Sequence, residues 1–98
     1  MEFKQKHDFS LLTNEAESMV IEELGARLDD GEFKDVCKCD DCVLDMAAYS
    51  LNHLKPIYRV SLLGSMYAHS MGEGEYKAEV TRSVEEAIRK IASNPSHD

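Results

Sequence analysis

The sequence predicts an all-α fold: a small single domain of about three main helices, with a short extended segment after the central helix. Two observations carry this prediction. Apolar residues recur at helical spacing in three separate stretches, and each stretch ends at a glycine or a proline. The chain has 98 residues, which is the length of one domain. We expect a single domain over residues 1–98, with flexible ends at residues 1–12 and 93–98.

The first helix is expected to begin after Asn14. The run Asn14-Glu15-Ala16-Glu17 matches a capping box, in which the cap side chain and the glutamate satisfy each other's backbone N–H groups. Asp29-Asp30-Gly31 ends the helix. Its apolar stripe consists of Ala16, Met19, Val20, Leu24 and Leu28. Residues 1–12 before it are charged, and we expect them to be irregular.

The central helix is expected over about residues 41–54. Asp40 or Asp41 can cap its first turn, and Pro56 prevents its continuation. Its apolar positions leave little polar surface, which is typical of a helix that is buried on more than one side. In so small a domain, we expect the second side to lie against another subunit. These positions are Val43, Leu44, Met46, Ala47, Ala48, Tyr49, Leu51 and Leu54.

Residues 57–63 are rich in β-forming side chains, which predicts a short strand or an extended crossover. Residues 65–74 carry no pattern that assigns them to an element. The last helix is expected over about residues 75–92, because apolar residues recur there every three or four positions, and Asn94-Pro95 ends it.

Composition excludes several classes of function. The net charge of −8 argues against DNA or RNA binding, which requires Lys and Arg to neutralise phosphates. No apolar run is long enough to cross a bilayer, so no membrane insertion is expected. The N-terminus has no apolar core of the signal-peptide type, and we therefore expect a cytoplasmic protein.

The three cysteines form the pattern C-x-C-x-x-C at the start of the central helix. Cys37, Cys39 and Cys42 suit a tetrahedral zinc site, because a helix N-terminus favours thiolates and zinc deprotonates them. A fourth ligand is missing from the pattern, and a nearby aspartate, a histidine or a group from another subunit could supply it. The alternatives are three thiols without a metal and a redox dithiol, while a catalytic zinc is disfavoured because no H-E-x-x-H pattern is present.

Polar and aromatic residues gather where the central helix ends. In one interpretation, Asn52, Pro56 and Tyr58 simply terminate the helix. In the other they belong to a ligand pocket, in which Arg59 and Lys55 neutralise phosphates and Tyr58 or Tyr49 stacks on a base. Asp45 or Asn52 would then read a purine edge.

The same region resembles a known family. The run Cys37-x-Cys39-x-x-Cys42, Leu44-Asp45, Ala47-Ala48, Leu51-Asn52-x-Leu54-x-Pro56-x-Tyr58 is similar to the pattern of the late competence protein ComFB family. The resemblance implies a role in competence or surface motility. It also implies a non-enzymatic regulatory protein that binds a cyclic di-nucleotide, chiefly cyclic di-GMP, as a homodimer.

By this resemblance the ligand residues are Asp45, Tyr49, Asn52, Pro56 and Tyr58, and we add His53 and Arg59 from their position in the turn. The family commonly has an arginine where this chain has His53, and a proline where it has Lys55. The alternative function is an adaptor of the competence or motility apparatus, which zinc stabilises and which binds an unidentified protein and no nucleotide.

Overall fold

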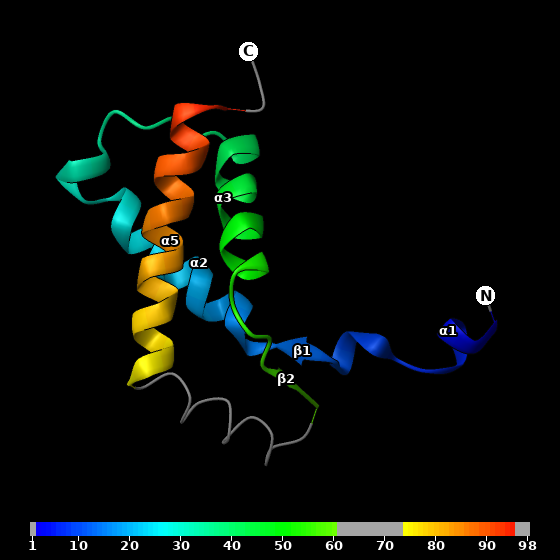
Figure 1. The fold of residues 1–98 in the computed structure, drawn as a ribbon. Coiled ribbons are helices and arrows are strands. Elements are labelled where there is room, and N and C mark those ends of the chain that lie inside the picture. Colours follow the sequence, from blue (N-terminus) through cyan, green and yellow to red (C-terminus); the bar gives the residue numbers. More distant parts are fainter. Residues whose placement is uncertain (1, 61–73, 96–98) are drawn as a thin grey trace.

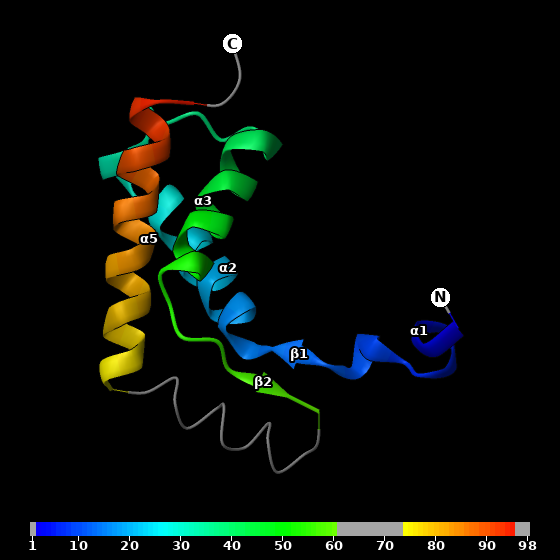
Figure 2. The same ribbon diagram turned by 45° about the vertical axis from the view of Figure 1, so that its right-hand side comes forward.

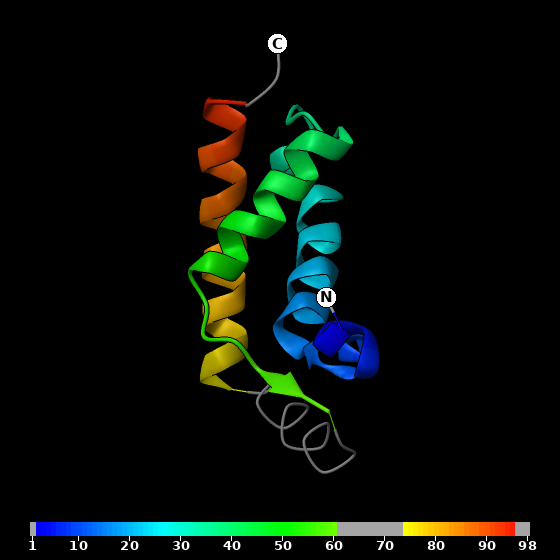
Figure 3. The same cartoon turned by 90° about the vertical axis from the view of Figure 1, so that its right-hand side faces the viewer.

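Three long helices dominate the protein. The structure, a computed structural model, describes residues 2–60 and 74–95. The long helices are α2 (Glu15–Leu28), α3 (Asp40–Asn52) and α5 (Glu75–Ser93). Figures 1 and 3 show them side by side, with α3 lying across the other two. The prediction of a small, mostly helical single domain with three main helices is confirmed.

The helices enclose one hydrophobic core. Each contributes a stripe of buried side chains, because apolar residues three or four positions apart lie on one face of a helix. Phe33 of the short 3-10 helix η2 (Gly31–Phe33) closes one end of this core. The fully buried apolar residues that the helices supply are Ala16 and Val20 from α2, Cys42 and Met46 from α3, and Val84, Ala87 and Ile88 from α5.

Asn14 begins α2, as the sequence predicts, and it does so with two bonds rather than with a capping box. Its Oδ1 accepts from the N–H of Ala16 at 3.1 Å and from the N–H of Ile57 at 2.8 Å. The N–H of Glu15 donates to the carbonyl oxygen of Ile57 at 2.7 Å. The reciprocal bond from Glu17 is not among the hydrogen bonds of residues 2–60 and 74–95. The backbone of Ile57, which follows α3, takes the place of Glu17 by bonding to Asn14 and Glu15.

A two-stranded antiparallel sheet extends this junction. The strand β1 (Thr13–Asn14) pairs with β2 (Tyr58–Arg59), and Thr13 lies opposite Arg59. The extended segment expected over residues 57–63 is therefore a strand at Tyr58–Arg59. Residues 61–73, which hold the rest of that segment and nearly all of the unassigned stretch 65–74, lie outside the described residues.

The helix α3 differs from its prediction at both ends. Cys39 is its N-cap instead of Asp40 or Asp41, and the helix ends at Asn52 rather than near Leu54. Only one face is buried, and the side chain of Leu44 on the other is 67% exposed. In a single chain, the second side of α3 is therefore exposed to solvent. The sequence predicts that another subunit covers this side.

The N-terminal segment forms an arm rather than the irregular stretch expected for residues 1–12. It contains the single-turn helix α1 (Glu2–Lys6) and the 3-10 helix η1 (Phe9–Leu11). The arm runs away from the three helices (Figures 1 and 2). The radius of gyration of 15.4 Å accordingly exceeds the value of about 13 Å for a compact domain of this length.

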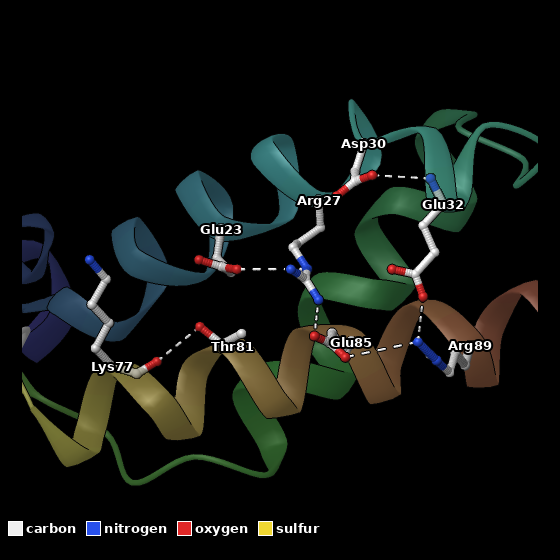
Figure 4. A network of polar contacts seen from close by, with 8 residues as sticks. All are labelled: Glu23, Arg27, Asp30, Glu32, Lys77, Thr81, Glu85 and Arg89. Carbon is white, nitrogen blue, oxygen red and sulfur yellow. Dashed lines mark hydrogen bonds and ion pairs between the residues drawn. The ribbon is translucent and has the colours of Figure 1, made fainter.

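Ion pairs between α2, η2 and α5 hold the segment that leads to the cysteines. Figure 4 shows Arg27 of α2 between Glu23 and Glu85, and Arg89 of α5 between Glu85 and Glu32. Arg89 donates to Glu32 at 2.8 Å, and its guanidinium lies 5.4 Å from the ring centre of Phe33. These contacts fix η2 against α5 and so place the loop that follows it.

Candidate functional site: a three-cysteine cluster and the turn after the central helix

The three cysteine sulfur atoms converge at the N-terminus of α3. The sulfur atoms of Cys37, Cys39 and Cys42 all lie within 4.8 Å of one another. Cys37 and Cys39 are exposed, whereas Cys42 is buried in the core. The cluster therefore has one anchored sulfur and two at the surface, so a metal ion can reach it from solvent.

Local backbone geometry explains the convergence. Cys39 has the extended backbone of an N-cap, with φ −70° and ψ 163°, and its Sγ accepts from the N–H of Cys42 at 3.5 Å. The residues of the first helical turn then bring Cys42 below Cys39. Because the helix N-terminus carries a partial positive charge, it favours the thiolate form of these groups.

Lys38 holds the loop from behind, a role that its position between two cysteines does not reveal in the sequence. Its ammonium group donates to the carbonyl oxygens of Phe33, Lys34 and Val36 at 3.0, 3.2 and 3.3 Å. An ammonium has three N–H donors, so these bonds use its full capacity. The loop between η2 and α3 is thereby closed on itself with the sulfur atoms grouped at one side.

The thiols of the cluster differ in acidity. A hydrogen bond from the backbone of Cys39, with further bonds from the thiols of Cys39 and Cys42, lowers the pKa of Cys37 below its ordinary value of 9.0. Burial, together with the two neighbouring thiols, raises the pKa of Cys42 to about 12. The surface thiol is thus the readier nucleophile and ligand, while the buried thiol needs a metal ion to displace its proton.

The donor set fits a thiophilic metal. Zinc–sulfur bonds of about 2.3 Å in a tetrahedron separate the sulfur atoms by about 3.8 Å, which small side-chain rotations of this cluster can reach. Among the described residues the group consists of the three cysteines alone, and neither Asp40, Asp41 nor His53 belongs to it. The fourth ligand therefore does not come from residues 2–60 or 74–95 as they are arranged here.

Apart from Asp45, the predicted ligand residues lie at the opposite end of α3 or beyond it. The 13 residues of this helix span about 20 Å, so the two candidate sites are separated by that length. Asp45 is half-buried on α3, and Asn52 and Pro56 are exposed. The structure thus places Asn52 and Pro56 at the helix end and its exit, away from the metal ligands, whereas Asp45 lies in the first half of α3, one turn after Cys42.

Tyr49 and His53 form an aromatic stack at this end. Their ring centres lie 4.3 Å apart with the rings 21° from parallel. The Nδ1 of His53 lies 2.8 Å from the carbonyl oxygen of Tyr49, so this nitrogen carries a proton and donates. The hydroxyl of Tyr49 donates to Glu86 of α5 at 2.9 Å, and this bond raises the pKa of the tyrosine.

Tyr58 and Arg59 belong to β2, where successive side chains point to opposite faces. The side chain of Tyr58 is exposed, whereas Arg59 forms an ion pair with Glu15 in the first turn of α2. Tyr76 of α5 donates its hydroxyl to the carbonyl oxygen of Lys55 at 2.6 Å and so holds the turn at Pro56. The partners Glu15, Glu86 and Tyr76 come from other helices, and no local pattern pointed to them.

With this geometry in place, comparison with known proteins identifies the family. The family model of the late competence development protein ComFB matches residues 13–95. The chain belongs to the ComFB family. Membership makes it a competence-related protein, and it confirms the resemblance inferred from the cysteine and helix-end residues.

The solved structures agree on the fold. The structure of the late competence protein ComFB from Bacillus subtilis matches with a TM-score of 0.69 at 23% sequence identity, over 87% of this chain and 94% of that chain. A search of the curated proteins found no match. In the described part of the chain, no helix has both the length and the apolar character that crossing a bilayer requires.

Proposed function

We propose that this ComFB-family chain is a non-enzymatic cytoplasmic regulator that binds cyclic di-GMP as a homodimer and carries a structural zinc ion at Cys37, Cys39 and Cys42. The observation that supports nucleotide binding is the aromatic stack of Tyr49 and His53 at the exit of α3. His53 and Tyr58 are both exposed, so flat aromatic surfaces face solvent where the family pattern ends.

Guanine recognition has suitable partners at this end. An aromatic platform holds a purine by stacking. The Asn52 amide next to it offers both a donor and an acceptor to the edge of a base, and it is exposed. Binding by stacking and hydrogen bonding requires no bond to be made or broken, which is why the proposal is a receptor and not an enzyme.

Phosphate recognition requires one ion pair to open. Arg59 is the cation closest in sequence to the exposed Tyr58, and it is held by Glu15. A phosphate can replace this carboxylate, because a guanidinium binds both groups with the same forked geometry. Removal of the Glu15 charge should therefore strengthen nucleotide binding, whereas removal of Arg59 should weaken it.

The role proposed for zinc is to stabilise the fold. Three thiolates gathered by one helix N-terminus and one loop resemble structural zinc sites, whose binding energy becomes folding energy. In this chain the ion would join the loop after η2 to the buried Cys42 at the core.

Calorimetric titration of the zinc-loaded protein with cyclic di-GMP tests the receptor proposal, with cyclic di-AMP and GTP as controls. We expect saturable binding of cyclic di-GMP alone. Tyr58→Ala and Arg59→Ala should each weaken it by about tenfold or more, the loss of a stacking or charge-assisted contact. Arg82→Ala, an exposed arginine of α5, is the matched control and should not change it.

Glu15→Gln should increase the affinity for cyclic di-GMP. A variant that merely disturbed the fold would lower this affinity, so Glu15→Gln separates the two explanations. Absence of heat with every nucleotide would reject the receptor. So would binding that all the variants retain unchanged.

The second candidate is a zinc-stabilised adaptor that binds a protein and no nucleotide. The cysteine cluster and the exposed apolar side of α3 favour it. It predicts that a chelator lowers the melting temperature markedly while cyclic di-GMP leaves it unchanged. A melting temperature that rises with cyclic di-GMP would reject this candidate.

A further inference from the structure

An apolar groove runs between α2 and α3 on the outer side of the molecule. Its volume is about 620 Å³, and nine of its ten lining residues are apolar or glycine. Ile21 and Leu44 stand on opposite sides of it and are 63% and 67% exposed. An exposed apolar surface of this kind marks an interaction site in a protein whose other surfaces are strongly charged. None of the predicted nucleotide or metal residues lines it.

The N-terminal arm, residues 2–12, carries a second set of exposed apolar side chains. Phe3 is 65% and Leu11 is 59% exposed, and Phe9 and Leu12 are also open to solvent. The arm's polar contacts and ring contacts within the described part of the chain join its own residues: Lys6 to Glu2, Ser10 to Asp8, and Phe3 to His7 and Phe9. The arm is therefore ordered in itself and leaves its apolar side chains uncovered.

The direction of the arm is set where it leaves the body. Pairing of β1 with β2 and the bonds of Asn14 fix the chain at the start of α2. From there the arm runs away from α5, on the side of the molecule on which α3 lies (Figures 1 and 2). A second copy that approaches the α2–α3 face therefore meets the arm as well as the groove.

We propose that the arm of each protomer docks into the α2–α3 groove of a second copy, so that two chains exchange arms. This inference rests on the homodimer of the proposed function and names the surfaces that form it. The exchange is self-complementary, as a two-fold interface requires, because each chain supplies one arm and one groove. The exchange would also cover the outer side of α3, where the apolar side chain of Leu44 stays exposed in a single chain.

Length and charge both suit this occupant. With α1 and η1 formed, the arm can span about 23 Å, which matches the roughly 20 Å length of either helix of the groove. The arm holds two lysines and two carboxylates, so the chain's net charge of −8 resides in the remainder. A neutral apolar arm can approach the acidic body of a partner, and its lysines can pair with Glu17 at the groove.

Sedimentation equilibrium of the full chain provides the first test. We expect a dimer whose dissociation constant rises about tenfold or more with Leu44→Glu in the groove or with Phe9→Ser in the arm, the effect of losing one buried large side chain. Val60→Glu is the matched control, because Val60 is 61% exposed and belongs to neither surface; it should change the constant by less than about twofold. Far-ultraviolet circular dichroism of each variant checks that the fold is kept.

Photo-crosslinking then identifies the occupant. A benzoyl-phenylalanine placed at Phe9 in a mixture of ¹⁴N- and ¹⁵N-labelled chains should give crosslinked peptides that join the two isotopes at α2 or α3. Crosslinks confined to single isotopes, with no mixed pairs, would show that the arm covers its own groove, and they would overturn the exchange. A dimer that does not respond to Leu44→Glu or Phe9→Ser would overturn it too, while leaving the homodimer intact.

A chain that is monomeric at all concentrations would reject the exchange and the homodimer together. Nucleotide binding is judged separately by the calorimetric titration, so the failure of one proposal can be told from the failure of the other.

Discussion

The backbone N–H of Cys42 donates to Sγ of Cys39 at 3.5 Å, so the thiol that caps α3 is also one of the three sulfur atoms of the candidate metal centre. Serine and cysteine differ in how well they serve as a helix N-cap and as a zinc ligand. A serine hydroxyl is a preferred N-cap, whereas it is a poor zinc ligand beside thiolates. Substitution at this position can therefore separate helix capping from metal binding.

We expect Cys39→Ser to lose zinc while the zinc-free protein keeps its stability. Cys39→Ala should lose zinc and also lower the free energy of unfolding of the zinc-free protein by about 0.5–2 kcal/mol, because the cap is gone. Zinc content by elemental analysis and urea denaturation after chelation measure the two effects. Equal stability of the serine and alanine variants would show that the sulfur does not act as a cap.

Lys38→Met should weaken zinc binding although Lys38 is not a ligand. The methionine keeps the length of the side chain but cannot donate to the carbonyl oxygens of Phe33, Lys34 and Val36, so the loop that groups the sulfur atoms loosens. We expect a loss of about 1–2 kcal/mol in the free energy of unfolding and a lower zinc affinity in competition with a chromogenic chelator. Lys34→Met, an exposed lysine in the same loop, should leave both quantities unchanged.

Asn14→Ala should destabilise the whole domain, because one oxygen joins the start of α2 to the exit of α3. The cap is worth about 1 kcal/mol, and the N–H of Ile57 left without its acceptor adds about 1–3 kcal/mol. Asn14→Asp keeps an acceptor oxygen and should cost far less. Thermal melts of both variants measure these costs. A similar fall in melting temperature for the two variants would mean that the amide nitrogen of Asn14 is the important group.

Tyr76→Phe should remove a hydrogen bond that holds the turn at Lys55 and cost about 1 kcal/mol near neutral pH. Burial raises the pKa of Tyr76 above its ordinary value of 10.0, so folding favours the protonated phenol. The contribution of this residue is thus complete below pH 10 and is lost as the pH rises beyond that value.

The stability difference between the original protein and Tyr76→Phe should therefore shrink as the pH rises above 10, as followed by chemical denaturation. A difference that stays constant over this range would show that the phenol proton is not coupled to folding.

Local patterns were enough to predict the main helices. Asn14 and the apolar stripe ending at Leu28 predicted α2 to the residue, and α5 was predicted to within one residue of its end. Each depends on a cap, a periodic face and a terminator that lie within a few residues of one another. The grouping of the three sulfur atoms was predictable for the same reason, since they lie within six positions at a helix start.

The cap of α3 was predicted wrongly, because any of three neighbouring side chains can accept the same backbone N–H group. Aspartate is the commoner cap, and the sequence therefore favoured Asp40 or Asp41 over Cys39. The burial of Cys42 in the core selects the register of the first turn, and this register brings Cys39 to the capping position.

The amino-acid sequence by itself determined where α2 and α5 lie, the cysteine cluster and the family, because these depend on residues close together in the chain. Only the tertiary structure decided that Glu15 holds Arg59, that Glu86 accepts from Tyr49, and that the arm stands apart from an apolar groove. Glu15 and Arg59 are 44 positions apart, and Tyr49 and Glu86 are 37 apart. Such partners meet only when helices pack on a shared core, and packing depends on the shape of the whole chain rather than on any local pattern.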